Sequence, residues 1–96
     1  MRTIWKFRCK VEDSFDHMLP KGSKILTVQM QSGVPHMWVE CPADARVGEG
    51  EIRRFEVHGT GHDFRSEGKA YIGTWQDNGF VWHLYEVVGR ALAVVA

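Results

Sequence analysis

The sequence predicts an all-β fold, with six or seven short antiparallel strands arranged as a small sandwich or open barrel. Apolar and polar residues alternate with a period of two in six segments, a pattern typical of half-buried strands. The turn Asp77-Asn78-Gly79 separates two of these segments and favours a hairpin, because Asn-Gly tolerates positive φ at both turn positions. No segment of ten or more residues has the 3.6-residue apolar period of a helix. These observations together point to antiparallel sheets.

The expected elements follow in order along the chain. The first strand has an apolar face of Trp5, Phe7, Cys9 and Val11, which alternate with Lys6, Arg8 and Lys10. Residues 12–21 are expected to form a loop with one short helical turn over 14–18. Further strands are predicted over 24–31, 36–41, 52–58, 71–76 and 80–87, with Leu26, Val28 and Met30 on one face of the second. A hairpin turn at 32–35 and an exposed loop at 42–50 complete the pattern.

Length and composition predict one domain over residues 1–96, in which 86–96 form an edge strand or a C-terminal arm. Eleven aromatic residues can fill a core, and the small size favours a homo-oligomer as an added source of stability. Twelve basic and twelve acidic side chains cancel, which argues against general nucleic-acid binding and against a membrane-surface protein. Two cysteines, no leader pattern and no long apolar run predict a cytoplasmic protein.

The segment His58-Gly59-Thr60-Gly61-His62 is the strongest candidate for a site. Backbone N–H groups beside Gly59 and Gly61 can form a concavity for an anion, and the Thr60 hydroxyl and His62 imidazole add polar contacts. Arg53 and Arg54 are close in sequence and would add charge to a phosphate site, as would Arg65 and Lys69. The alternative is a tight structural turn, since the segment lacks a strand–glycine loop–helix phosphate motif.

Other residues offer further candidates and further structural explanations. Trp38 is expected opposite Met37 and Val39 on an outward face, where it would stack on a base or form a subunit interface; Tyr71 is a second stacking candidate. The His-x-x-x-His spacing of His58 and His62 would place both rings on one face only in a helix, which Gly59 and Gly61 disfavour, and no Cys-x-x-Cys is present. No metal and no cofactor is therefore expected. Cys9 and Cys41 lie on apolar registers and are expected to be buried, unreactive thiols.

Several fragments resemble a family of small uncharacterised proteins found mostly in bacteriophages and prophages. The fragments are Met1-Arg2-Thr3-Ile4-Trp5-Lys6-Phe7, Leu19-Pro20-Lys21-Gly22 before Ile25-Leu26-Thr27-Val28-Gln29, Gly33-Val34-Pro35 before Trp38, Phe55 with Gly59-Thr60-Gly61-His62, and Tyr71-Ile72-Gly73-Thr74 with Val81-Trp82-His83-Leu84-Tyr85-Glu86. The resemblance reaches Glu86 and implies a phage protein that works inside an infected bacterial cell. It implies no particular chemistry.

The function expected from the sequence is therefore binding without catalysis. The hypothesis is a phage protein that captures a small phosphorylated ligand, a nucleotide, and thereby sequesters a nucleotide signal of host defence. Its site residues would be Gly59, Thr60, Gly61, His62, Arg53, Arg54, Trp38 and Tyr71. Two alternatives stay open: an interaction module that binds a host or phage protein through a sheet edge or aromatic face, and a small hydrolase that uses His58 or His62.

Overall fold

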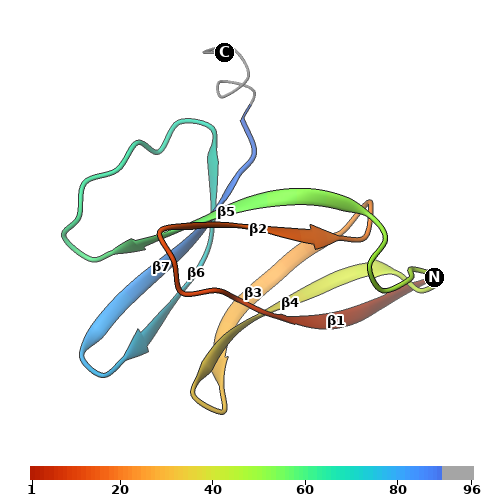
Figure 1. The fold of residues 1–96 in the computed structure, drawn as a ribbon, viewed down its shortest axis with the longest axis horizontal. Helices are drawn as coiled ribbons and strands as arrows, with labels where there is room; N and C mark the ends of the chain where they lie inside the picture. The colour runs from red at the N-terminus through yellow and green to blue at the C-terminus, as the bar shows by residue number, and fades with distance from the viewer. Residues whose placement is uncertain (90–96) are drawn as a thin grey trace.

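The computed structural model describes residues 1–89 and contains seven strands and no helix over that range. The strands are β1 (Arg2–Arg8), β2 (Ser14–Leu19), β3 (Lys24–Gln31), β4 (Val34–Pro42), β5 (Glu51–Gly59), β6 (Lys69–Asp77) and β7 (Phe80–Val87) (Figure 1). The predicted all-β class is confirmed. A helix long and apolar enough to cross a membrane is absent from the described range. The predicted edge strand or arm falls mostly on residues 90–96, which lie outside the described range; residues 86 and 87 belong to β7.

The strands form two antiparallel sheets, with orders β1-β4-β3 and β2-β5-β7-β6. The fold is therefore a sandwich, one of the two architectures that the sequence allows. Gly73 of β6 lies against Val28 of β3, where a Cβ atom would come within 2.8 Å of the valine Cγ1. A glycine at this position lets an edge of one sheet approach the backbone of the other closely.

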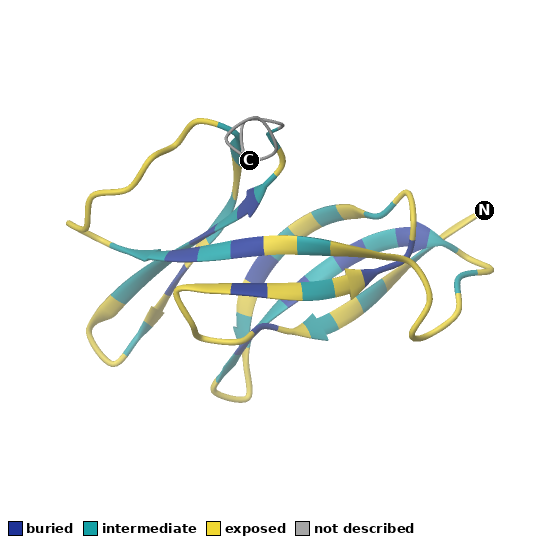
Figure 2. Cartoon of the chain, turned by 45° about the horizontal axis from the view of Figure 1, so that its top comes forward, coloured by how far each residue is buried: buried dark blue, intermediate teal, exposed yellow. Residues whose placement is uncertain are grey.

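Alternating burial along the strands builds the core between the sheets (Figure 2). β4 alternates buried and half-buried residues along its whole length, as expected for a central strand with one face on the core. The buried apolar core consists of Cys9, Phe15, Leu19, Val28, Met37, Val39, Phe55, Val57, Trp75 and Leu84. Phe7, expected on the inward face of its strand, packs against this core and is partly buried, as is Trp82.

The segment expected to be a loop with a helical turn over 14–18 is the strand β2, so that prediction is wrong. Phe15 and Leu19 are both buried, and β2 pairs with β5 through Phe15 opposite Phe55. The two phenyl rings stack with centroids 5.3 Å apart. Cross-strand burial of this kind outweighs the turn preference of the flanking aspartates and proline.

Leu26 does not lie on the inward face as predicted, because β3 contains a bulge. The β3–β4 register shifts between Ile25 and Thr27, so Leu26 is 40% exposed while Ile25 packs against the core. Val28 and Met30 face inward as predicted. One extra residue in a strand reverses the faces on one side of it, and strict alternation does not reveal it.

Both expected hairpins are present. Asn78 and Gly79 have φ of 51° and 86°, and Ser32 and Gly33 have φ of 53° and 78°. Two successive positive φ values define the turn whose twist matches that of the flanking strands. The second hairpin thus places a serine where asparagine or glycine is the preferred residue.

Candidate ligand-binding site

A hollow of about 320 Å³ opens beside the His58–His62 segment. We call it the loop hollow; it is lined by Gly59, Thr60, His62, Gly79, Phe80, Val81 and Trp82. β5 ends at Gly59, and the chain turns there because the His62 amide donates to the Gly59 carbonyl at 3.1 Å with Gly61 at φ 89°. A positive φ at the third residue is typical of a type II turn and favours glycine. The turn carries Thr60 and His62 to one wall.

Aromatic rings form the opposite wall. Phe80 and Trp82 stack with centroids 5.7 Å apart and planes at 19°, and Phe80 is 63% exposed. Gly59 lies directly opposite Trp82 in the β5–β7 ladder. A Cβ at Gly59 would lie 3.0 Å from the His62 ring and 3.2 Å from the Trp82 ring, so the missing side chain keeps space between these groups.

The backbone amides of the turn are partly engaged within the protein. The Thr60 amide donates to the Val81 carbonyl at 3.1 Å, and the His62 amide donates to Gly59. The Thr60 hydroxyl contacts His83 Nε2 at 2.8 Å. The turn therefore does not present the expected row of free N–H groups for a phosphate. With its aromatic wall, the loop hollow is better suited to a planar group than to an anion.

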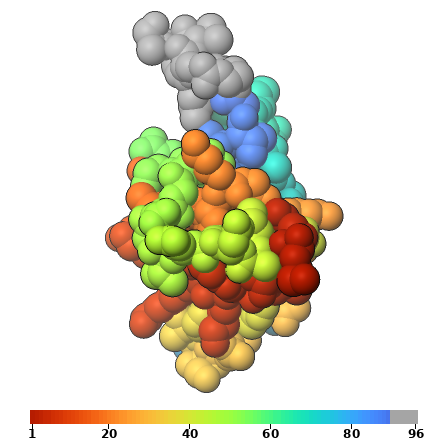
Figure 3. Space-filling view, turned by 90° about the vertical axis from the view of Figure 1, so that its right-hand side faces the viewer, coloured from red at the N-terminus to blue at the C-terminus, as the bar shows by residue number. Residues whose placement is uncertain are grey.

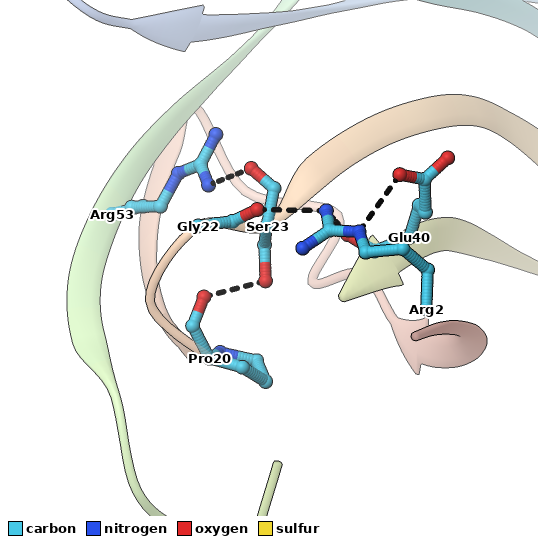
Figure 4. A network of polar contacts seen from close by, with 6 residues as sticks. All are labelled: Arg2, Pro20, Gly22, Ser23, Glu40 and Arg53. Carbon is cyan, nitrogen blue, oxygen red and sulfur yellow. Dashed lines mark hydrogen bonds and ion pairs between the residues drawn. The ribbon is translucent and has the colours of Figure 1, made fainter. Parts of the chain in front are cut away.

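Arg53 is committed to a structural contact. Its guanidinium donates to both carboxylate oxygens of Glu86, at 2.5 and 2.8 Å, and to the Ser23 carbonyl at 2.7 Å. Figure 4 shows Arg53 holding the turn after β2 from one side while Arg2 reaches the Gly22 carbonyl and the Glu40 carboxylate. Hydrogen bonding to Glu86 raises the pKa of Arg53 more than burial lowers it. Arg53 therefore does not reach the loop hollow.

Arg54 also has a partner of its own. It donates to the Asp16 carboxylate at 2.9 Å on the outer face of the β2–β5 pair. This hydrogen bond, with smaller charge effects, lowers the pKa of Asp16. Arg54 is separated from Gly59 by roughly 17 Å at the rise of a strand. Arg53 and Arg54 are close to the loop in sequence, but they do not form a cluster with it in space.

The two stacking candidates lie on two different sheets. Trp38 is on the outward face of β4, opposite Lys6 and Thr27, and its predicted orientation is confirmed since Met37 and Val39 are both buried. Tyr71 is on β6 and is 57% exposed. Its hydroxyl contacts Thr74 Oγ1 at 2.5 Å. Neither ring lines the loop hollow.

Both histidines of β5 and β7 belong to a network on the outer face of the four-stranded sheet. His58 Nε2 contacts the Glu56 carboxylate at 2.8 Å, and its ring stacks on Phe64 at a centroid distance of 4.0 Å. Thr74 Oγ1 lies 2.9 Å from His83 Nδ1, so two threonine hydroxyls hold the two ring nitrogens of His83. This network orients Thr60 at the edge of the loop hollow.

The chemical alternatives find little support in the described part of the chain. No group of three or more His, Cys, Asp or Glu side chains has a metal-binding arrangement within residues 1–89. Cys9 and Cys41 are buried and free, as predicted. Burial raises the pKa of the Cys9 thiol to about 12, so little nucleophilic thiolate forms near neutral pH.

Comparison with known proteins shows the family of this chain. Residues 1–92 match the family described as Domain of unknown function (DUF7352), and the chain belongs to that family. No curated protein and no solved structure matches the chain significantly. The family assignment covers almost the whole chain and brings no activity with it.

Sequence reasoning identified one wall of the loop hollow and missed the other. Gly59, Thr60 and His62 line it as candidates, whereas Phe80 and Trp82 were not assigned to a site. The missing information is strand order, because Trp82 meets Gly59 only through β5–β7 pairing. The sequence does show Phe80 directly after the Asn78-Gly79 turn, and therefore at an end of the sandwich.

Proposed function

We propose that the protein is a non-enzymatic binding protein for a small phosphorylated ligand, a nucleotide, whose base lies in the loop hollow. The single observation that carries this proposal is the stacked Phe80–Trp82 wall facing Gly59, Thr60 and His62 across a hollow of about 320 Å³. Small-ligand sites have volumes from roughly 300 Å³ upward and combine apolar walls with a few polar groups. The Thr60 hydroxyl and the His62 ring supply those polar groups here.

The biological setting belongs to the same proposal. The resemblance to phage proteins supports a role inside an infected bacterial cell, in the cytoplasm, where tight binding without turnover would sequester a nucleotide signal of host defence. The proposal also includes a homo-oligomer, because a chain of 96 residues gains stability from an interface. Binding requires no metal and no cofactor.

Calorimetry with ADP, GDP and their nucleosides tests the proposal. Wild type is expected to bind at least one of them with one ligand per chain and to return it chemically unchanged. Gly59→Ala is expected to weaken binding about tenfold, because the added methyl group enters the space between the His62 and Trp82 rings. Its backbone φ lies outside the positive range that L residues avoid, so alanine adds no backbone strain there.

A pair of aromatic variants provides the control. Phe80→Leu removes a ring from the hollow and is expected to weaken binding, whereas Trp38→Leu removes a ring from the outward face of β4 on the other sheet, outside the hollow, and is expected to leave binding intact. Equal affinities of Phe80→Leu and wild type for every bound nucleotide would overturn the site assignment. Native mass spectrometry of the same samples reports the number of subunits and any retained ligand.

A further inference from the structure

A second hollow, of about 490 Å³, lies at the same end of the sandwich as the loop hollow. We call it the basic hollow; it is lined by Arg8, Cys9, Lys10, Val11, Gly33, Val34, Pro35 and Asp77. The Cys9 amide donates to the Pro35 carbonyl at 3.0 Å, and the Cys9 side chain is buried. This anchor fixes the backbone between Arg8 and Lys10, whose own side chains are exposed.

Basic residues outnumber acidic ones in the lining of the basic hollow. Arg8 and Lys10 take part in no ion pair among residues 1–89, while Arg2, Arg53 and Arg54 each have a carboxylate partner. Asp77 is the one acidic residue in the lining. Asp16 is close enough to Lys10 for the lysine charge to lower the pKa of Asp16 slightly, but Asp16 is held by Arg54.

A third hollow, called the balanced hollow, differs from the basic hollow because its basic and acidic residues are equal in number. It has a volume of about 350 Å³ and lies at the opposite end of β1 and β4, where Arg2 pairs with Pro42. The N-terminal strand and the yellow-green loop after β4 meet at this end, which faces the viewer in Figure 3. Its lining contains Lys21 and Arg46 but also Asp44 and Glu49, so its charges cancel. It has no preference for an anion.

The loop hollow and the basic hollow share one hairpin. Asp77 lines the basic hollow, Gly79 and Phe80 line the loop hollow, and Asp77 is directly opposite Phe80 in the β6–β7 ladder. Residues opposite each other in an antiparallel ladder are about 5 Å apart, which is well within the span of a nucleotide. The two hollows therefore adjoin at the end of the β6–β7 hairpin.

We infer that the phosphate groups of the bound nucleotide are held by Arg8 and Lys10, while its base stacks on Phe80. This inference rests on the proposed function and replaces Arg53 and Arg54, which the protein uses internally, as the source of positive charge. Arg8 and Lys10 outnumber Asp77 in the lining, which leaves the basic hollow with excess positive charge, and arginine donates to phosphate oxygens in pairs.

The test compares ADP with adenosine by calorimetry for wild type, for Arg8→Gln/Lys10→Gln and for Lys21→Gln/Arg46→Gln. Wild type is expected to bind ADP at least tenfold more tightly than adenosine, with an ADP affinity that falls as salt rises. The Arg8/Lys10 variant is expected to lose this difference and still bind adenosine. The Lys21/Arg46 variant removes the same two residue types from the balanced hollow and is expected to behave as wild type.

The possible calorimetric results distinguish the phosphate assignment from the base site. Unchanged ADP affinity in the Arg8/Lys10 variant overturns the phosphate assignment and leaves the base site standing. Binding of neither nucleoside nor nucleotide by wild type overturns the proposed function and this inference with it. Amide chemical shifts of wild type provide a check that needs no variant: ADP, but not adenosine, is expected to shift the resonances of Arg8, Lys10 and Gly33, and absence of these shifts with bound ADP contradicts the inference.

Discussion

Arg53 and Arg54 are adjacent in sequence and face opposite sides of β5. Arg53 points inward to Glu86, which is 8% exposed, and Arg54 points outward to Asp16. Successive side chains of a strand alternate between faces, so two neighbouring cations on a strand cannot serve one ligand. Cations that form no ion pair among residues 1–89 are found instead where a strand ends, at Arg8 and Lys10.

The Glu56 carboxyl is expected to make the stability of the folded state depend on pH. Burial favours its protonated form, but hydrogen bonds from Lys69 and His58 outweigh this effect and lower the pKa below the ordinary 4.5. A carboxyl whose pKa is lowered by folding stabilises the folded state above its unfolded pKa. That stability is lost as the pH falls through the lowered pKa.

Urea unfolding between pH 7 and pH 3 should therefore distinguish Glu56→Gln from wild type. At pH 7 the variant is expected to be less stable by about 1–2 kcal/mol, since it loses charge-assisted hydrogen bonds. The difference is expected to shrink as the pH falls below 4.5. Glu67→Gln in the exposed loop is the control and should track wild type at every pH. A pH-independent gap for Glu56→Gln would show that the ion pairs do not cause it.

At the scale of elements, the sequence predicted the strands whose pattern is self-contained. The boundaries 24–31 and 80–87 match β3 and β7, and the Asn78-Gly79 turn has the expected φ values. β2 was missed because the inward position between its two buried residues, Phe15 and Leu19, holds the polar His17, which interrupts the apolar alternation. Only pairing with β5 makes it a strand, and pairing is a tertiary property.

The two hairpins have the same turn geometry with different residues, which gives a matched pair of variants. Ser32→Asn places a residue that tolerates positive φ at 53°, and Asn78→Ser makes the reverse change at 51°. We expect the first to raise the free energy of unfolding by about 0.5 kcal/mol and the second to lower it by a similar amount. Thermal unfolding monitored by circular dichroism measures both, and shifts of the same sign would contradict this account.

At the scale of the whole molecule, the proposed site depends on how the two sheets meet. Gly59, Thr60 and His62 of the loop line the loop hollow, but its aromatic wall comes from β7 and the basic side chains come from the end of β1. Periodicity reports the face of a residue within its own strand and carries no information on strand order. The sequence therefore predicts the class of fold and one segment of the proposed site, while the grouping of the other lining residues depends on strand order.

Arg53 links the two sheets, and its removal should affect the whole fold. It joins β5 and β7 through Glu86 and holds the Ser23 carbonyl, which precedes β3 of the other sheet. Arg53→Met leaves Glu86 buried without a partner and is expected to lower the free energy of unfolding by about 3 kcal/mol or more. Arg53→Met/Glu86→Leu removes the stranded charge and is expected to recover most of that loss.

Chemical denaturation of wild type, both single variants and the double variant completes the cycle. A strong interaction energy between the two positions is expected, because each single change leaves a desolvated charge that the double change removes. Arg54→Met serves as the control, since its exposed partner Asp16 remains solvated when the arginine is lost. If Arg53→Met and Arg54→Met were equally stable, the inward ion pair would not be what holds the turn after β2 between the sheets.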